Sequence, residues 1–545
     1  MTNSINDMLE AEAFLIIGSN TTEQHPIIGL NIRGKVESGT PLVVADPRAT
    51  DIARRADIHL KLKPGTNVAL LNGLAHVILE EGLEDRESIA TRTEGFGEWR
   101  AVVEKYTPER VAHITGVPAD EMIRAARVFA SHRPGCLIYA MGITQHTSGH
   151  QGVMACANLQ MLLGNMGLPG GGVNPLRGQN NVQGACDMGC LYSYYPGYQR
   201  VADPALRKKF ASAWGVPQPQ EPGLSVTEIF DAALEGKIKG LYVVGENPMM
   251  SEPDVNHARR CLESLEFLVV QDIFLSETAQ LADVVLPAAC FAEKDGTFTN
   301  TERRVQRVRK AVDPAGQARA DWQIVCQLAK RLQDAGPKMQ DAPYSGWDYA
   351  SPAEIMAEIA ALTPIYGGIS YERIEEVGLQ WPCPTPDHPG TPILHVGRFS
   401  RGRGKFNPVE YQPSAEEPDE EYPLILTTGR ILEHYHTGTM TRRVAGLDQL
   451  VPEERVEINT ADAARLGISD GDWVWVHSRR GEVRVRARVN RRCRPGVVFM
   501  TFHFAEALGN LLTNAALDPV AKIPEYKVCA VCIEKEEALL RMELE

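Results

Sequence analysis

The first third of the chain alternates short apolar runs with longer stretches of mixed polarity. Four apolar runs have the pattern of buried strands, at residues 14–17, 42–45, 58–62 and 137–140. The pattern of helices is found in the stretch up to residue 32 and at residues 68–80, 111–130 and 154–163. Strands that alternate with helices predict a parallel sheet with helices on its faces. Each strand ends in a polar or glycine-containing turn, so these turns should meet at the sheet edge where open α/β folds bind ligands.

The same pattern returns further along the chain. After a connector with helical character at 203–234, residues 241–244, 267–270 and 284–286 have the pattern of strands. The first ends in Gly245-Glu246-Asn247-Pro248 and the second in Gln271-Asp272. We therefore expect a second α/β unit, followed by a hairpin at 293–306 around Asp295-Gly296 and a helix at 322–332.

The last quarter of the chain is rich in strand patterns. Residues 333–352 and 382–422, rich in proline, glycine and acidic residues, read as long connections. Residues 424–427, 456–459, 473–477, 482–489 and 497–501 then read as strands, with turns at 470–472 and 480–481, which predicts a compact β-barrel. We expect an α/β protein with two doubly wound nucleotide-binding halves of mostly parallel sheet and a C-terminal β-barrel. The predicted boundaries are 1–178 and 179–290 for the two α/β domains, 291–385 for a connecting hairpin and helical segment, and 386–545 for the barrel.

Length and charge narrow the class of protein. A chain of 545 residues is too long for one hydrophobic core, and its net charge of -14 argues against a nucleic-acid-binding face. No run approaches the ~20 apolar residues that a membrane span needs. The first residues carry neither the basic start nor the apolar core of a signal peptide, which favours a cytoplasmic location.

The eleven cysteines do not form a recognisable framework. Their odd number and scattered positions argue against a disulfide scaffold, and no group has iron–sulfur spacing. The pairs Cys186/Cys190 and Cys529/Cys532 are close in sequence, and the second is a CxxC that could bind metal or act as a redox pair. It lies in the strand-like segment YKVCAVCIE, where alternation sends the two thiols to opposite faces. We favour a packing role and predict no metal ligand in this chain.

Two turns of the first α/β segment have chemistry suited to a nucleotide. Gly18-Ser19-Asn20 follows the first strand, and Asp46-Pro47-Arg48 follows the second, so an acid lies at the tip of the second strand. A ribose or a guanine edge could meet Asp46, and a phosphate could meet Arg48. Because no GxGxxG is present, a nicotinamide site is not indicated; Asp-Pro is also a common turn former, so both interpretations of Asp46 stay open.

The segment from residue 174 to 189 reads NPLRGQNNVQGACDMG and has neither apolar period. Its amides and glycines suit the wrapping of a large polar ligand. The guanidinium of Arg177, permanently charged, can hold a carboxylate or phosphate through two parallel hydrogen bonds. The alternative is an ordinary surface loop rich in glycine and asparagine.

The sequence RGQNNVQGACDMG resembles the active-site loop of molybdenum- or tungsten-dependent formate dehydrogenases, which bind two molybdopterin guanine dinucleotides. The resemblance extends over essentially the whole chain and is strongest at residues 11–187 and in PEYKVCAV near the end. It implies two-electron oxidation of formate to carbon dioxide, or the reverse, with electron-transfer iron–sulfur or diaphorase-type subunits as partners. The alternatives are another molybdopterin oxidoreductase, such as a nitrate reductase, and a non-catalytic cofactor-binding chain that needs a partner chain.

The resemblance also assigns residues, position by position. Arg177 would seat formate as the catalytic residue, with Gln179 beside it among the cofactor ligands. One cofactor would contact Gly18, Asn20, Asp46, Arg48, Gly65, Gly142 and Gln145. The other would contact Gly245, Asn247, Gln271 and Asp272. The barrel would close over both cofactors through Thr428, Arg430, His436, Asn514, Tyr526 and Lys527.

One departure from the resembled family concerns the region before Ala11. Members carry there a cysteine cluster with a four-iron iron–sulfur centre, and a cysteine or selenocysteine that ligates the metal, with a histidine beside it. None of these residues is in this chain. We expect Met1 to be an internal methionine downstream of a selenocysteine codon read as a stop, or the missing segment to be a separate chain. An export signal would then not be excluded, and the chain as given should be inactive alone.

Overall fold

The computed structural model describes residues 1–335 and 346–536, which form two compact units. Unit 1 comprises Met1–Gly178, Met249–Ala258 and Ile393–Glu545, and unit 2 comprises Gln179–Pro248 and Arg259–Pro392. Within the described residues, no helix is long and apolar enough to cross a membrane.

Unit 1 contains the parallel sheet predicted for the first third of the chain. Its five strands have the order β3-β2-β1-β5-β6, and every neighbouring pair is parallel. Their bounds are Ala13–Ile17 for β1, Leu42–Ala45 for β2, Ile58–Leu60 for β3, Gly135–Tyr139 for β5 and Val173–Pro175 for β6. The order turns back between β1 and β5, and the crevice beyond such a switch point is the usual ligand site of open α/β sheets.

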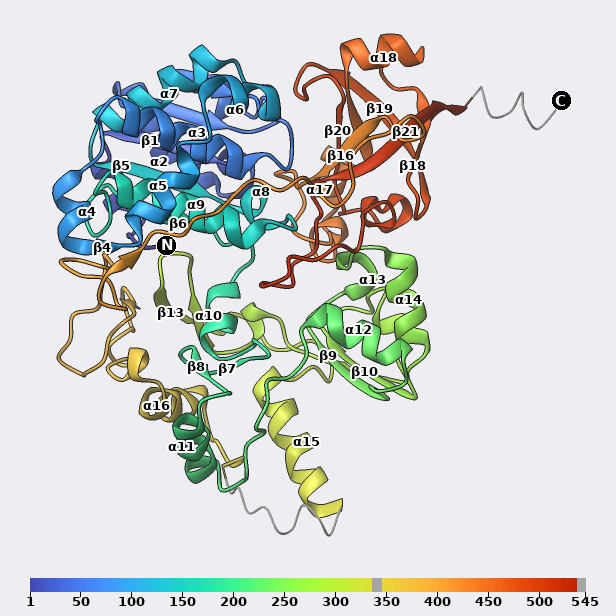
Figure 1. Cartoon of the computed structure of the whole chain (residues 1–545). Coiled ribbons are helices and arrows are strands. Elements are labelled where there is room, and N and C mark those ends of the chain that lie inside the picture. Colours follow the sequence, from blue (N-terminus) through green and yellow to red (C-terminus); the bar gives the residue numbers. More distant parts are fainter. Residues whose placement is uncertain (336–345, 537–545) are drawn as a thin grey trace. The chain divides into compact units, whose positions relative to one another are not determined.

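Helices cover both faces of this sheet because each strand is buried on both sides. Alternate residues of β1 belong to two different hydrophobic clusters: Leu15 packs with α3 and α7, whereas Ile16 packs with α2. The helices α3, α6 and α7 lie together on one side (Figure 1). The helices are α1 (Thr21–Gln24), α2 (Pro26–Glu37), α3 (Asn67–Glu80), α4 (Arg86–Arg92), α5 (Phe96–Val103), α6 (Pro108–Thr115), α7 (Ala119–Ser131), α8 (Met141–Thr144) and α9 (Gly149–Leu162).

The helical stretch predicted at 111–130 is interrupted. Gly116 ends α6 in the left-handed conformation, with φ of 69°, and Pro118 precedes α7. Glycine tolerates this conformation without steric cost and proline lacks the N–H that a continuing helix needs, so the chain forms two helices.

The C-terminal part of unit 1 forms the predicted β-barrel. It closes in the order β16-β20-β17-β19-β18-β21. The strands of the barrel are β16 (Leu424–Thr428), β17 (Arg455–Asn459), β18 (Trp473–His477), β19 (Glu482–Asn490), β20 (Val497–Met500) and β21 (Cys529–Lys535). The same part of the chain contains the helices α17 (Ala445–Leu450) and α18 (Thr460–Leu466). Alternation along β21 puts Cys529 in the barrel core and leaves Cys532 half-buried on the other face, as predicted.

Unit 2 contains a smaller parallel sheet in the order β11-β10-β9. Its strands are β9 (Gly240–Val244), β10 (Phe267–Asp272) and β11 (Val284–Pro287). The second α/β pattern of the sequence is therefore confirmed as parallel sheet. The helices of unit 2 are α10 (Val182–Asp187), α11 (Pro204–Trp214), α12 (Val226–Leu234), α15 (Asp321–Ala335) and α16 (Pro352–Leu362). Most of α13 (Pro248–Ser251) and the first residues of α14 (Val255–Glu263) belong to unit 1. The short strands β7 (Tyr194–Tyr195) and β8 (Gln199–Arg200) pair with each other.

The predicted hairpin exists, but its turn was placed wrongly. Strands β12 (Gly296–Thr299) and β13 (Arg304–Val308) pair antiparallel, and β14 (Leu379–Gln380) adds to β13. The turn lies at residues 300–303, where the Asn300 side chain accepts hydrogen bonds from the amides of Glu302 and Arg304 at 3.1 and 3.0 Å. An asparagine that bonds its own following backbone forms a turn as readily as Asp-Gly does. Asp295-Gly296 instead leads into β12.

The segment predicted to be irregular, residues 174–189, is more regular than expected. It begins in β6 and includes the short helix α10. The long connection at 382–422 contains β15 (Gly404–Lys405), which pairs in parallel with β4 (Thr93–Glu94) in a separate two-stranded sheet. Residues 336–345 of the other predicted connection lie outside the described residues.

Candidate functional site

A cavity of about 800 Å³, open to solvent, lies in unit 1 at the carboxyl edge of the five-stranded sheet and against the barrel. The residues that line it come from the turns after β1, β2, β3 and β5 and from the ends of β16, β20 and β21. Ten residues predicted as cofactor ligands are among them: Gly18, Asn20, Asp46, Arg48, Gly65, Gly142, Gln145, Thr428, Arg430 and Lys527.

Two glycines form the floor of the cavity at the switch point. Gly18 has φ of 58°, and its amide donates to the Ala45 carbonyl at 3.0 Å. The Gly142 amide donates to the Gly18 carbonyl, also at 3.0 Å. A Cβ built on Gly18 would lie 2.6 Å from the carbonyl carbon of Gly142. The tips of β1 and β5 therefore meet backbone to backbone, which only glycine permits at both positions.

Asp46 and Arg48 are joined by a local turn after β2. The Arg48 amide donates to Asp46 Oδ1 at 2.9 Å. Burial raises the pKa of the Asp46 carboxyl, although the Arg48 amide opposes this effect. The Arg48 guanidinium donates from Nη2 to Glu457 Oε2 at 2.9 Å and lies over the Phe499 ring, 3.3 Å from its centroid. Both residues of the predicted nucleotide turn thus have fixed positions in the cavity wall.

The barrel contributes two further cations. Lys527 Nζ donates to the Thr428 carbonyl at 2.7 Å, and Arg430 lies with its guanidinium carbon 5.4 Å from the centroid of the Phe502 ring. Burial, with the nearby charge of Arg430, lowers the pKa of Lys527 to about 7. With Arg48, three basic side chains line a wall in which Asp46 is the carboxylate. This arrangement favours an anion that carries several charges.

Several buried polar atoms near this wall have no hydrogen-bond partner among the described residues. They are Ser19 Oγ, Asn20 Nδ2, Arg48 Nε and Arg430 Nε. Buried polar atoms in folded proteins are nearly always bonded, so these donors indicate a polar ligand. Together with the cations, the close glycine backbones and the acceptor Asp46, they fit a nucleotide with a pyrophosphate.

Three predicted barrel ligands lie outside the residues that line the cavity. The Tyr526 hydroxyl donates to the Ser251 carbonyl at 2.8 Å. The His436 carbonyl accepts from His503 Nδ1, and burial, helped by Arg430, lowers the pKa of His436 to about 4. Asn514 accepts from the Ala516 amide at 2.9 Å and donates to the Val528 carbonyl at 2.8 Å. The side chains of Tyr526 and Asn514 are thus used in packing within unit 1, and the ligand roles of all three stay predictions.

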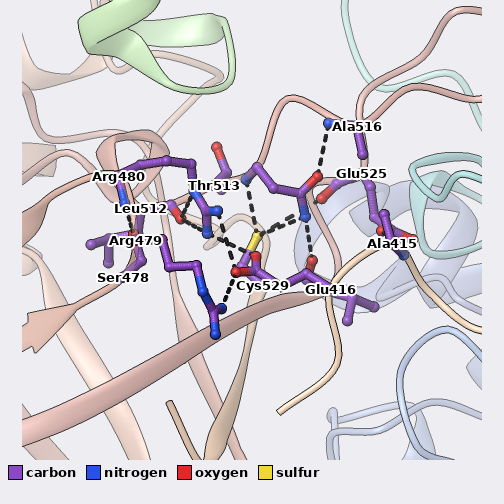
Figure 2. A network of polar contacts seen from close by, with 12 residues as sticks. Ala415, Glu416, Ser478, Arg479, Arg480, Leu512, Thr513, Ala516, Glu525 and Cys529 are labelled. Carbon is purple, nitrogen blue, oxygen red and sulfur yellow. Dashed lines mark hydrogen bonds and ion pairs between the residues drawn. The ribbon is translucent and has the colours of Figure 1, made fainter. Parts of the chain in front are cut away.

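A network of polar contacts joins residues 415–416, 478–480 and 512–516 of the barrel part (Figure 2). Arg479 and Arg480 converge on Glu416, at 2.6 and 2.8 Å, and Arg480 also donates to the Leu512 carbonyl. Glu525, near Lys527 in sequence, accepts from the Ala415 amide at 3.0 Å. The network therefore fixes the segment that delivers Lys527 to the cavity.

Arg177 and Gln179 follow β6 and fall on either side of the boundary between the two units. Arg177 is exposed and is not among the residues that line the cavity. Its carbonyl oxygen lies 2.8 Å from His25 Nε2. The structure therefore does not bring Arg177 into the cavity wall of unit 1, and its catalytic role stays a prediction.

The four residues predicted for the second cofactor gather at the carboxyl edge of the unit 2 sheet. Gly245 follows β9 and its amide donates to the Gln271 carbonyl at 2.8 Å. The Gln271 side chain bonds Tyr242 and Asp321, and Asn247 bonds Glu277 and Thr278. Asp272 accepts from the Ile273 amide at 2.7 Å. The sheet brings these residues together, and their polar side chains bond neighbours within unit 2.

Sequence reasoning missed several residues of the cavity. Phe499 and Phe502 line it from the barrel, and Glu457 holds Arg48 from β17. Glu457 is 409 positions from Arg48 in sequence, so no local pattern marks the pair. The carboxylate in the middle of the predicted strand 456–459 was the available signal, because a buried-strand pattern with a central glutamate calls for a cationic partner.

The fold and the cavity define a class of protein, and the comparisons agree with it. The chain belongs to the molybdopterin oxidoreductase family: residues 1–331 match the family described as Molybdopterin oxidoreductase, and residues 424–530 match the Molydopterin dinucleotide binding domain. The second match covers most of the barrel. The second matched domain is thus one that binds a molybdopterin dinucleotide. The basic side chains, the close glycine backbones and Asp46 of the cavity fit the nucleotide part of such a cofactor.

Within the family, the chain is similar to formate dehydrogenases. It is 51% identical to F420-dependent formate dehydrogenase 2 subunit alpha of Methanococcus maripaludis, covering 98% of this chain and 78% of the relative. It is 42% identical to formate dehydrogenase H of Escherichia coli, covering 98% and 74%. It is 37% identical to the assimilatory nitrate reductase catalytic subunit of Bacillus subtilis, covering 98% and 76%. Among solved structures, acetylene hydratase of Pelobacter acetylenicus shares the fold, with a TM-score of 0.76 at 22% identity over 98% of this chain and 78% of that chain.

Proposed function

We propose that this chain carries the catalytic part of a formate dehydrogenase, which converts formate to carbon dioxide, a proton and two electrons, or runs the reverse reaction. The observation that carries this proposal is the identity of 51% and 52%, over nearly the whole chain, to two proteins named as formate dehydrogenase alpha subunits. The loop RGQNNVQGACDMG, singled out from the sequence alone, supports the same substrate.

The cavity residues of unit 1 are proposed to hold the guanine dinucleotide part of the cofactor. Arg48, Arg430 and Lys527 would neutralise the phosphates, and the backbone at Gly18 and Gly142 would lie against them. Asp46 would accept hydrogen bonds from the guanine edge. When bound, the metal–pterin group supplies the two-electron redox chemistry. A second dinucleotide is proposed for the edge formed by Gly245, Asn247, Gln271 and Asp272, with Gln179.

Arg177 is the proposed seat for formate. Its guanidinium carries a permanent charge and a planar pair of donors that matches a carboxylate. It would orient the C–H bond and offset the negative charge of the substrate, whereas His436, with a pKa held near 4, would remain neutral at physiological pH. Electrons would leave through an iron–sulfur or diaphorase-type partner subunit, in keeping with the alpha-subunit names of the relatives.

Nitrate reduction is the competing function. The relative that carries that name is 37% identical, below the 42–52% of four formate dehydrogenases over similar coverage. Formate is therefore the favoured substrate. Either molybdenum or tungsten is compatible with this proposal.

The direct test is anaerobic assay of the native holoenzyme with viologen dyes. We expect formate to reduce oxidised dye, and nitrate to leave reduced dye unchanged. Metal analysis of the same preparation distinguishes molybdenum from tungsten. Oxidation of reduced dye by nitrate, with no reaction of formate, would overturn the proposal.

A further inference from the structure

Arg48 is held from two sides by residues of the barrel. Its guanidinium donates to Glu457 Oε2 at 2.9 Å and lies 3.3 Å from the centroid of the Phe499 ring. Only about 5% of the Arg48 surface is exposed. Its Nε is buried and has no hydrogen-bond partner among the described residues. A side chain with this much freedom in solution is therefore confined to one arrangement, in which its Nε–H donor is still unused.

Glu457 and Phe499 form one clamp because they are direct neighbours across two barrel strands. Glu457 on β17 is the register partner of Phe499 on β20. Val456 and Ile458 point into the barrel core, as do Val498 and Met500, so both clamp residues point outward. Opposed residues of an antiparallel pair have their Cβ atoms ~4.5–5.5 Å apart, which is the spacing needed to grip one guanidinium.

The clamp is itself fixed by a partly buried chain of alternating charges. The second oxygen of Glu457 accepts from Arg492 at 3.3 Å, and Arg492 donates to Glu23 of α1 at 2.7 Å. The Ala49 amide donates to the Arg492 carbonyl at 2.7 Å. The turn that carries Arg48 is thus tied to the barrel by backbone and side chain, and Glu457 is shared between two cations.

We propose that Glu457 and Phe499 are positioning residues that hold Arg48 in the orientation in which it binds the cofactor phosphates. This inference rests on the proposed assignment of the cavity to a molybdopterin guanine dinucleotide. Glu457 acts through Arg48, and Phe499 covers one face of the guanidinium and so fixes the plane in which its donors lie. The salt bridge between Arg48 and Glu457 would thereby help to retain the cofactor, and it also joins the barrel to the sheet.

A simple salt bridge predicts a different outcome from a positioning role. If Glu457 only stabilised the fold, its loss would lower the unfolding temperature and leave the rate of cofactor loss from the folded protein unchanged. If it positions Arg48, its loss should weaken cofactor retention, and this loss should vanish when Arg48 is already absent. The two interpretations separate in a double-mutant cycle.

The experiment follows the loss of guanine nucleotide from purified holoenzyme during dialysis. Samples are taken at intervals, and the nucleotide that remains bound is released by acid hydrolysis and quantified by chromatography per mole of protein. Glu457→Gln should lose nucleotide roughly tenfold faster than the parent, as expected for one charge-assisted hydrogen bond. Glu457→Asp, which keeps the charge, should recover part of this loss. The matched control is Glu453→Gln, because Glu453 pairs with Arg455 and Arg486 and none of the three lines the cavity.

The double variant Arg48→Met with Glu457→Gln distinguishes a positioning role of Glu457 from a purely stabilising one. We expect it to lose nucleotide no faster than Arg48→Met alone. Additive losses, or equal losses in Glu457→Gln and the Glu453→Gln control, would overturn the positioning role. The proposed function is judged separately: a parent enzyme that holds guanine nucleotide but does not react with formate refutes formate oxidation and leaves the clamp standing. A parent without guanine nucleotide refutes the cofactor assignment and the clamp with it.

Discussion

The amide of Gly142 donates to the carbonyl of Gly18 at 3.0 Å, so the tips of β5 and β1 touch without any side chain between them. This contact closes the floor of the cavity at the switch point of the sheet. Because a Cβ on Gly18 would lie 2.6 Å from the Gly142 carbonyl carbon, any other residue must push the two strands apart. The shape of the cavity therefore depends on the lack of a Cβ atom at both Gly18 and Gly142.

Gly18→Ala should destabilise unit 1 and weaken nucleotide retention. The left-handed backbone at Gly18 costs a side chain ~1–2 kcal/mol, and the clash with Gly142 adds to this. Urea unfolding measures the loss. The control is Gly34→Ala on the exposed side of α2, where a Cβ meets no atom within 4 Å; this change should stabilise by about 0.5–1 kcal/mol. Equal effects of the two substitutions would contradict the close-approach argument.

Lys527 should make ligand binding depend on pH near neutrality. Its pKa is lowered to about 7 in the folded protein, below the value of 10.5 expected when unfolded, so the unfolded chain binds the extra proton between these values. The stability of the cofactor-free protein attributable to this residue should therefore rise with pH from about 7 to 10.5. Binding of a phosphate-containing ligand needs the charged amine and should weaken over the same range.

Calorimetric titration of cofactor-free protein with guanosine diphosphate across pH 6–9 checks this sign. Lys527→Met should bind more weakly at pH 6 and show a flatter pH profile, because the titrating amine is gone. A parent profile that strengthens with rising pH would contradict the assignment of Lys527 to the phosphate wall.

Substitution of Asp187 should lower the free energy of unfolding more than substitution of any other carboxylate of unit 2. It is fully buried and accepts hydrogen bonds from Gln183, Tyr198, Tyr366 and Trp381, at 2.7–2.8 Å. Asp187→Asn turns one acceptor into a donor that faces other donors, so we expect a loss of about 2–4 kcal/mol. Chemical unfolding of Asp187→Asn measures it, and Asp313→Asn, at a surface carboxylate, should have no measurable effect.

Arg177→Ala should lower formate turnover by about 10²–10³, if the guanidinium stabilises charge during the reaction as proposed. Arg177→Lys should recover only part, because an ammonium lacks the paired planar donors. Steady-state kinetics of both variants, at matched metal content, test the role. Unchanged formate kinetics in Arg177→Ala would remove Arg177 from the site and leave the cavity of unit 1 unaffected.

Most of the fold could be predicted because it depends on local patterns. The strands of both α/β sheets and of the barrel coincide with apolar runs that end at turns, and these ends carry the ten predicted ligands that line the cavity. The hairpin turn was misplaced because Asp295-Gly296 is the stronger sequence signal, whereas Asn300 forms the turn through its own side chain. Helix α10 was missed because its six residues, VQGACD, are too few to show a helical apolar period, and Asp187 anchors it through distant donors.

The cavity wall shows why contacts across the chain are harder to predict. Glu457 and Phe499 lie in ordinary strand patterns, and their role appears only when the barrel meets the sheet. Asn514 and Tyr526, assigned by resemblance alone, have their side chains bonded to backbone within unit 1. Residue type and strand position predict that a group reaches an edge, but not which neighbour uses its hydrogen-bonding capacity.

The cavity draws on residues as far apart as Gly18 and Lys527, and this has a consequence for synthesis in the cell. At about 5–20 residues per second, roughly half a minute to two minutes separate the emergence of its floor from that of its last cation. A growing polypeptide on the ribosome can form the five-stranded sheet early, yet the basic wall of the cavity stays incomplete until Lys527 has emerged. Insertion of the proposed nucleotide against all three cations must therefore wait for the barrel, and whatever delivers it must recognise a chain in which the sheet and the barrel have already met.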